Sequence, residues 1–313
     1  RPPTLNVEPF LKVLKMIDRR FASDERGDLL VFLPGVGEID TVCEVLREYA
    51  GESKRWIVLP LHASLPAEEQ ERVFDDPPTG VRKCILSTNV AETSITIDGI
   101  RFVCDSGREK EMGVEKESGV QRLQERWISK ASANQRKGRA GRTGPGYCFR
   151  LYSEAKYDKL CAFSSPEIHR ISLPSVVLEV KSLDDAVYRI GYKGGVEDFP
   201  FIDPPDKQRV ASAIKQLEDG GAVDDEERLL PLGSILSSLP VDIHLGLVLT
   251  YSAVFDEVPP LAVAAASMSV SSPFHRVQPG RDQDVINARK EFYSRHGDAF
   301  SLLVLFGEWM KLK

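Results

Sequence analysis

The chain has 313 residues, 42% of them apolar, and a formal net charge of -6. This length predicts two or three domains. A run of about 18 apolar residues is missing, which argues against a membrane span. The opening RPPTLNVEPF has no signal-peptide pattern, so we expect a soluble intracellular protein, nuclear or cytoplasmic, with no membrane partner.

The first half of the sequence alternates helix and strand signals. Apolar residues recur at helical spacing from Phe10 to Phe21 and again from Glu38 to Tyr49. Short apolar runs predict five buried strands, within DLLVFLPG, RWIVLPLH, KCILST, IRFVCD and YCFRLY. Strands that are apolar throughout and separated by helices predict an α/β fold with a parallel sheet covered on both faces. Ligands of such sheets bind beyond the carboxyl ends of the strands, where LPG, STN and DSG are expected.

The pattern changes after Ser153. PEIHRISLPSVVLEVKSL predicts a helix with turn signals at both ends, and Asp206 to Asp219 predicts a second, amphipathic helix. GGAVDDEERLLPLG predicts a short hairpin with an acidic tip. Two helices and a hairpin make up a small winged-helix module. From Gly233 onward, the apolar residues predict packed helices.

Five cysteines are spread along the chain without the close pairs typical of metal sites. Most are flanked by apolar, strand-like residues, so we interpret them as reduced core thiols of an intracellular protein. The five histidines do not cluster with them, and no structural metal is expected.

The segment QRKGRAGR, from Gln135 to Arg142, is locally basic in an acidic chain. Between residues 121 and 150 there are eight Lys or Arg and one acid, Glu125. Such a patch attracts phosphate because distant charges are screened beyond about 8 Å. Arg136, Arg139 and Arg142 are three residues apart, so on a helix they project on roughly one side. From composition alone, a solvated basic helix explains them equally well.

A second unusual segment, STNVAETSITIDGI, runs from Ser87 to Ile100. Its hydroxyl and amide side chains, together with loop N–H groups, can donate hydrogen bonds to phosphate oxygens. A plain polar loop is the alternative. We expect the segment on the same edge of the sheet as the arginines.

FLPG, STNVAETSITIDGI and QRKGRAGR, in this order, resemble motifs IV, V and VI of DEAH-box helicases, a branch of helicase superfamily 2. The resemblance covers essentially the whole chain, since PLHASLPAEEQERVF resembles the segment between motifs IV and V, and PEIHR, PLG and LPVD resemble later domains. It implies a second RecA-like domain at residues 1–153, a winged-helix domain at 154–233 and the first part of a helical ratchet domain at 234–313. RKCILSTN, RFVCDSGREKEM and RLQERWISKAS look most similar to the member associated with nonsense-mediated mRNA decay.

The resemblance implies a set of ATP-facing residues. Arg139 and Arg142 match arginine fingers that contact the γ-phosphate, where planar guanidinium donors stabilise the spreading charge. Gln135 matches the glutamine that orients the attacking water. Asp98 matches a ribose-contacting position, and Phe74 matches the aromatic residue that stacks on adenine.

It also implies a set of RNA-facing residues. Thr88 and Asn89 match contacts to RNA phosphates, as does the backbone near Gly35. Lys137 departs from the small residue common at its position and is expected to point to solvent or RNA. The segment from Ser106 to Trp127 resembles a β-hairpin that this family projects towards RNA, with a mobile surface loop as the alternative.

The sequence contains neither a GxxxxGK[ST] loop nor a DEAH sequence. We therefore expect a first RecA-like domain before Arg1 to supply most ligands of ATP and Mg²⁺, and the isolated chain to be inactive as an ATPase. The implied whole protein is an ATP-dependent RNA helicase whose partners are RNA, that first domain and protein activators. The competing class is a non-catalytic, helicase-like interaction module.

Overall fold

The structure is a computed structural model that describes residues 5–22, 25–93, 95–114, 121–142, 144–183, 195–270, 274 and 282–312. The chain divides into two units, Arg1–Arg170 and Ile171–Lys313. Each is described by itself.

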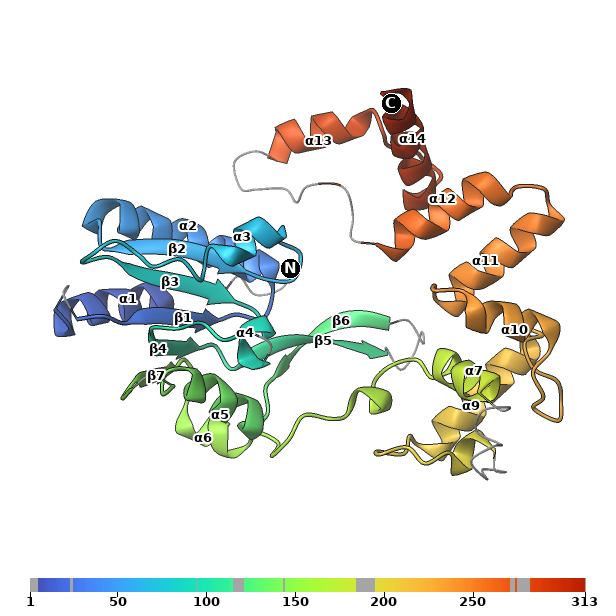
Figure 1. The fold of residues 1–313 in the computed structure, drawn as a ribbon, viewed down its shortest axis with the longest axis horizontal. Helices are drawn as coiled ribbons and strands as arrows, with labels where there is room; N and C mark the ends of the chain where they lie inside the picture. The colour runs from blue at the N-terminus through green and yellow to red at the C-terminus, as the bar shows by residue number, and fades with distance from the viewer. Residues whose placement is uncertain are drawn as a thin grey trace. The chain divides into compact units, whose positions relative to one another are not determined.

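A five-stranded sheet forms the centre of the first unit (Figure 1). Its strands are ordered β2-β3-β1-β4-β7, and every neighbouring pair is parallel. All five strands predicted from the apolar runs are confirmed: β1 (Asp28–Phe32), β2 (Trp56–Leu61), β3 (Arg82–Ser87), β4 (Ile100–Asp105) and β7 (Tyr147–Arg150). The carboxyl ends of these strands lie along one edge of the sheet and the amino ends along the other.

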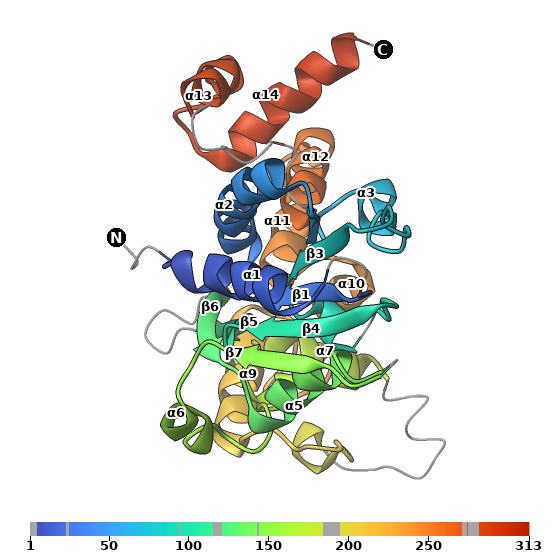
Figure 2. The ribbon, with the colours of Figure 1, turned by 90° about the vertical axis from the view of Figure 1, so that its left-hand side faces the viewer.

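Both faces of the sheet are buried, as a parallel sheet requires. Alternate residues of β1 point to opposite faces, so Leu29 and Val31 belong to one core cluster and Leu30 and Phe32 to the other. The first cluster is completed by the predicted helices α1 (Glu8–Arg20) and α2 (Val36–Ser53), and Figure 2 shows α1 beside β1. The second face is covered by residues from α4 (Val90–Thr93) and from the chain around α3 (Ala67–Glu71) and α5 (Lys130–Arg139).

The segment between β4 and α5 forms an antiparallel ribbon. Strands β5 (Arg108–Val114) and β6 (Gln121–Trp127) pair over seven residues each. The predicted hairpin is thus confirmed in its strands, while its turn, residues 115–120, lies outside the described residues. Figure 1 shows the ribbon extending from the edge of the sheet at which β1 and β3 end.

The chain between β7 and the second unit contains α6 (Glu154–Asp158) and a 3-10 turn, η1 (Glu167–His169). The single helix predicted over PEIHRISLPSVVLEVKSL is therefore wrong at its start. The α-helix α7 (Pro174–Ser182) begins only at Pro174, because proline is well tolerated in the first helical turn and poorly inside a helix.

The second unit is helical. The predicted amphipathic helix is confirmed as α9 (Lys207–Asp219), preceded by the 3-10 turn η2 (Val196–Asp198). The predicted hairpin is reduced to one antiparallel bridge, between Val223 and Leu229, because PLG opens a helix instead of extending a strand. Among the described residues that follow, there are five further helices: α10 (Pro231–Ser238), α11 (Ile243–Val254), α12 (Val258–Ser269), α13 (Asp282–Lys290) and α14 (Asp298–Lys311).

The sequence predicted that the cysteines are buried and that no helix spans a membrane. Cys43, Cys84 and Cys104 are buried, but Cys148 is half-buried and Cys161 is exposed, so the interpretation of every cysteine as a core thiol is wrong for Cys161. Among the described helices, none alone is long and apolar enough to cross a membrane, although α10 and α11, bent by 117°, pass that test as a pair.

Gly146 allows the end of α5 to pack close to the start of β4. A Cβ at Gly146 would overlap the carbonyl oxygen of Ala140 and lie 2.6 Å from that of Arg101. We expect Gly146→Ala to lower the free energy of unfolding by about 1 to 3 kcal/mol, the usual cost of overpacking. Urea denaturation would measure it.

Gly138→Ala is the matched control. A Cβ at Gly138 in α5 has no neighbour within 4 Å, so this change is expected to leave stability unaltered or to raise it by up to about 1 kcal/mol. Equal stability of the two variants would contradict the close packing at Gly146.

Candidate functional site

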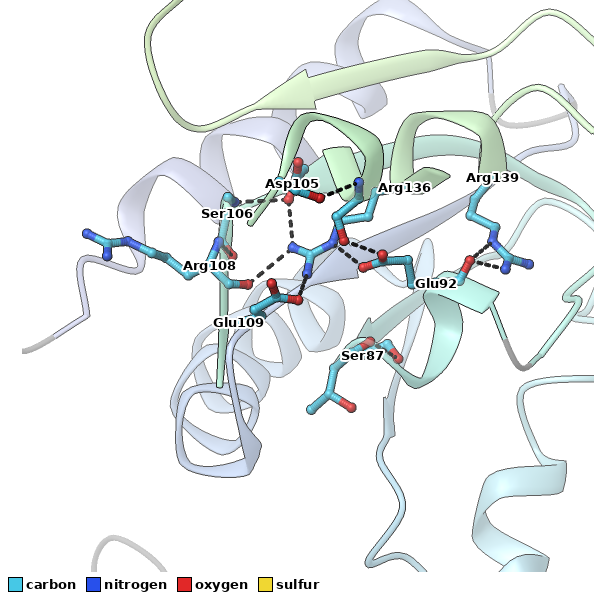
Figure 3. A network of polar contacts seen from close by, with 12 residues as sticks. Ser87, Glu92, Asp105, Ser106, Arg108, Glu109, Arg136 and Arg139 are labelled. Carbon is cyan, nitrogen blue, oxygen red and sulfur yellow. Dashed lines mark hydrogen bonds and ion pairs between the residues drawn. The ribbon is translucent and has the colours of Figure 1, made fainter. Parts of the chain in front are cut away.

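A single buried guanidinium lies at the centre of a polar network in the first unit (Figure 3). Arg136 has only 1% of its surface exposed. Its Nε donates to Glu92 Oε2 over 2.9 Å, and its Nη1 donates to Asp105 Oδ1 over 2.9 Å. Its Nη2 lies 3.7 Å from Glu109 Oε2. Arg136 thereby joins its own helix, α5, to α4, to the end of β4 and to β5.

The remaining polar atoms around Arg136 are also paired. Its Nη1 donates to the carbonyl oxygen of Arg108 over 3.1 Å. The Tyr152 hydroxyl donates to Asp105 Oδ2 over 2.7 Å, and the Ser132 hydroxyl donates to Glu92. Ser129 starts α5 by accepting the backbone N–H of Ser132. The planar guanidinium, with donors in fixed directions, is the group suited to such a set of acceptors.

Electrostatics distinguish the three carboxylates. Burial disfavours the charge of Arg136, but Asp105 and then Glu92 outweigh burial and raise the Arg136 pKa. Burial raises the pKa of Glu109 to about 7, with repulsion from Glu111 and Glu92 adding to it and attraction to Arg136 opposing it. Glu109, at 3.7 Å from Arg136 Nη2, is also held less closely than Glu92 and Asp105, which accept hydrogen bonds from Arg136 over 2.9 Å. Removing one partner of a buried ion pair typically costs about 3 to 5 kcal/mol.

Sequence reasoning missed this network because it grouped Arg136 with two other arginines as one basic helical side. An available signal was the acid that ends an apolar strand: Asp105 closes IRFVCD at the carboxyl edge of the sheet. A carboxylate in that position needs a buried donor.

The other two arginines have different surroundings. Arg139 is 6% exposed, and its Nε and Nη1 donate to the carbonyl oxygens of Glu92 and Ile95, each over 2.8 Å. Burial, followed by the charge of Arg142, lowers the Arg139 pKa. Arg142 is exposed and donates to Thr96 Oγ1 over 2.5 Å. Since α5 ends at Arg139, the prediction that all three share one helical side is wrong for Arg142.

The polar segment and the arginines lie together as expected, but they extend from one edge of the sheet to the other instead of sharing one edge. The segment runs from the carboxyl end of β3 down to the amino end of β4. Arg136 contacts Asp105 at the carboxyl edge, whereas Ala140, just after α5, lies near Arg101 at the start of β4. Three residues of helix advance about 4.5 Å, so Arg136 and Arg139 lie at different heights along the sheet. Arg136 contacts Glu92, Arg139 reaches Ile95, and Arg142 contacts Thr96 further along the segment.

Two predicted ATP-facing residues line one cavity. Phe74, 53% exposed, and Asp98, also exposed, border a cavity of about 430 Å³. Its other walls include Gly27, Val81 and Gly99, the residues that precede β1, β3 and β4. The cavity therefore lies at the amino edge of the sheet. Asp98, on its wall, is two residues along the chain from Thr96, which Arg142 contacts.

The predicted RNA-facing residues lie at the opposite edge. Thr88 and the exposed Asn89 follow β3, and Gly35 follows the neighbouring β1 and precedes α2. Lys110 of the β5–β6 ribbon lies against Gly35, with its ammonium 2.7 Å from Glu38.

Gln135 and Lys137 are both exposed on α5, outside the Arg136 network. The structure thus brings the predicted site residues together in two groups and leaves these two on the helix surface between the buried arginines.

Comparison with known proteins identifies relatives of the chain. The family model "Helicase conserved C-terminal domain" matches residues 10–144. The chain is 50% identical to the human "Probable ATP-dependent RNA helicase DHX34" over 99% of its length and 26% of that relative. It is 37% identical to the Bos taurus "ATP-dependent DNA/RNA helicase DHX36" over 93% of its length and 28% of that relative. It is 40% identical to the Arabidopsis thaliana "DExH-box ATP-dependent RNA helicase DExH1" over 88% of its length and 27% of that relative. The chain spans about a quarter of the length of these relatives.

The raised pKa of Glu109 predicts a pH-dependent stability. Its pKa of about 7 lies above the ordinary 4.5, so between these values the folded state binds more protons than the unfolded state. This stability is fully present below about pH 4.5 and lost as pH rises through 7. Glu109→Gln, neutral throughout, should reduce the fall in unfolding free energy between about pH 5 and pH 8 by on the order of 2 kcal/mol.

Urea denaturation at both pH values would measure this difference. Glu125→Gln is the control, because Glu125 lies on the same ribbon but is exposed. An unchanged pH dependence in Glu109→Gln would contradict the burial of an ionisable Glu109 against Arg136, Glu92, Glu111 and Arg170.

Proposed function

Because the chain belongs to the DEAH-box family of superfamily 2 RNA helicases, we propose that it is the second RecA-like domain and adjoining domains of an ATP-dependent RNA helicase. The parallel α/β core of the first unit is consistent with a RecA-like domain. The first RecA-like domain, RNA and protein activators are its proposed partners. Most ligands of Mg²⁺ are assigned to that first domain.

The observation that carries this proposal is the division of the candidate residues between opposite edges of one sheet. Phe74, Asp98 and Arg142 lie at or near the amino edge, and Gly35, Thr88 and Asn89 lie at the carboxyl edge. A motor that couples ATP hydrolysis to movement along RNA needs both ligands on one rigid domain without overlap. This arrangement meets that need.

The amino edge has the features of half a nucleotide site. The cavity beside Phe74 and Asp98 is within the size range of small-ligand pockets. Phe74 offers an exposed ring for stacking on adenine, and Asp98 offers a carboxylate for the ribose hydroxyls. Stacking on one phenylalanine discriminates little between bases, so selectivity among nucleoside triphosphates is expected to be weak.

The arginines supply the phosphate end of this half-site. Arg142 is exposed and has one hydrogen bond to Thr96, so it can turn towards a γ-phosphate presented by the first domain. Arg139 is anchored to two carbonyl oxygens and would have to exchange them for phosphate oxygens. Gln135, exposed on the same helix, is assigned to orient the attacking water.

The carboxyl edge has the features of an RNA-phosphate site. Thr88 and Asn89 offer hydroxyl and amide donors, and the backbone N–H groups at the start of α2 follow Gly35. Such contacts hold the backbone without reading bases, so RNA binding is expected to be tolerant of sequence. Lys137, exposed on α5, is assigned to solvent or RNA.

Finer assignments within the family remain part of the proposal. The helices α7 and α9 and the bridge at Val223 support a winged-helix domain at 154–233, and the helices from α10 onward support a ratchet domain at 234–313. Greater identity to the human DHX34 relative than to the DHX36 and DExH1 relatives supports a place in that subgroup. A role in nonsense-mediated decay and a nuclear or cytoplasmic location follow from the sequence resemblance.

A non-catalytic interaction module is the less supported alternative. Such a module has no need for a complete set of ATP-facing side chains. Phe74, Asp98, Gln135, Arg139 and Arg142 are all present. Their presence favours a motor.

Substitutions at Arg142 test the proposed catalytic role in the full-length protein. Arg142→Ala is expected to lower ATP turnover at saturating RNA by about 10³-fold, the lower range for arginine fingers, while RNA affinity without nucleotide is kept. Arg142→Lys keeps the charge but loses the planar fork, so it should stay strongly impaired if two donors contact the γ-phosphate.

Lys137→Ala is the control, five residues before Arg142 in the same basic segment. It should leave the maximal ATP turnover nearly intact and change RNA affinity at most. If Arg142→Ala instead weakens nucleotide-free RNA binding while turnover at saturating RNA stays high, the finger assignment is wrong and the segment is an RNA clamp.

A further inference from the structure

We propose that Glu109 is a positioning residue that couples RNA held by the β5–β6 ribbon to the nucleotide-facing arginines, acting through the guanidinium of Arg136. The inference rests on the proposed function, since it assumes that the two edges of the sheet take ATP and RNA. It adds a specific connection between those edges.

The connection is short and continuous. Glu109 on β5 lies 3.7 Å from Arg136 Nη2, and Arg136 Nε donates to the Glu92 carboxylate over 2.9 Å. The backbone carbonyl of the same Glu92 accepts from Arg139 Nε over 2.8 Å. Figure 3 shows these groups in sequence, from Glu109 through Arg136 to Arg139. A displacement of β5 therefore acts on Arg139 through two intervening residues.

Burial makes this connection effective. Arg136 is 1% exposed and Glu109 is 7% exposed, so water screens their interaction little. Arg136 also rests on the Phe32 ring, 4.9 Å from its centroid, which restricts its movement on the sheet side. Protein interiors are closely packed and hard to compress. When one buried side chain moves, the groups packed against it must therefore move as well.

The ribbon backbone also contacts Arg136, since the carbonyl oxygen of Arg108 at the start of β5 accepts from Arg136 Nη1 over 3.1 Å. The other side-chain attachments of the ribbon lead elsewhere. Lys110, adjacent to Glu109, points to the opposite face of the ribbon and pairs with Glu38 of α2. Glu111 lies 3.7 Å from Arg170, which also donates to the carbonyl oxygen of Met112. Among the side-chain ion pairs of the described ribbon residues, the one made by Glu109 is directed into the arginine network.

Glu109 is also the adjustable member of that network. Glu92 and Asp105 accept hydrogen bonds from Arg136 at 2.9 Å, whereas Glu109 lies beyond hydrogen-bond distance at 3.7 Å. Burial disfavours its charge, as its raised pKa of about 7 indicates. The Glu109 carboxylate can therefore approach or leave Arg136 while the two tighter pairs and the hydrogen bond to the Arg108 carbonyl oxygen are kept. The link then has two arrangements, one with Glu109 close to Arg136 and one with it further away. RNA and nucleotide can favour opposite arrangements.

The test is a linkage measurement on the full-length protein. RNA affinity is measured with and without a non-hydrolysable ATP analogue, and the ratio of the two dissociation constants is the coupling factor. In the wild type we expect a factor that differs from one by at least about fivefold, the lower range of allosteric coupling. Glu109→Gln should bring this factor to within about twofold of one.

Glu125→Gln, an exposed glutamate on the same ribbon, is the matched control and should keep the wild-type factor. A Glu109→Gln protein with the wild-type factor overturns the inference, as does a wild-type factor of one. Failure of the wild type to bind either ATP analogue or RNA would instead contradict the proposed function.

A second readout needs no substitution. Hydrogen exchange of the β5 and β6 amides in the wild-type protein should change when the ATP analogue binds without RNA. Unchanged exchange there contradicts the inference even if Glu109→Gln does not fold. If both the exchange and the coupling factor respond as expected, a purely structural role for Glu109 is excluded, because such a role would not link nucleotide to the ribbon.

Discussion

A buried positive charge must be compensated, and the compensation of Arg136 determines how the functional segments of the first unit are held. Three carboxylates, from α4, β4 and β5, surround one guanidinium that has almost no access to water. Loss of Arg136 would leave these buried carboxylates without their cationic partner. Helix α5 is therefore fixed against the polar segment, and the arginines that follow Arg136 along the helix take their places from it.

This constraint explains how one sheet can separate two kinds of ligand. Arg136, in the last turn of α5, reaches Asp105 at the carboxyl edge, and Ala140, just after the helix, approaches Arg101 near the amino edge. The polar segment covers the same span beside it. RNA-facing and ATP-facing residues can thus belong to one continuous stretch of sequence and still lie at opposite edges, connected by the side chains between them.

The amino-acid sequence was enough to predict the strands of the sheet. It was not enough to assign separate roles to the three arginines. Apolar runs such as DLLVF are buried on both faces, a pattern that few structures other than a parallel strand explain, and all five predicted strands are present. The hairpin strands followed from family resemblance, not from periodicity. The roles of Arg136, Arg139 and Arg142 could not be separated, because equal spacing on a helix does not reveal which of them meets a buried carboxylate. That depends on Glu92, Asp105 and Glu109, which are 27 to 44 residues away along the chain. The exposure of Cys161 was missed for a similar reason, since its flanking residues resemble those of buried cysteines.

Hydrogen exchange of an Arg136→Met variant tests the central claim most directly. Methionine keeps much of the volume but removes the charge and all five donors. If one guanidinium holds these segments together, amides of β5, β6, residues 90–93 and residues 95–99 should lose protection together, while those of β1 and β3 keep it. Loss of protection confined to α5, with the ribbon and the polar segment unchanged, would contradict the account.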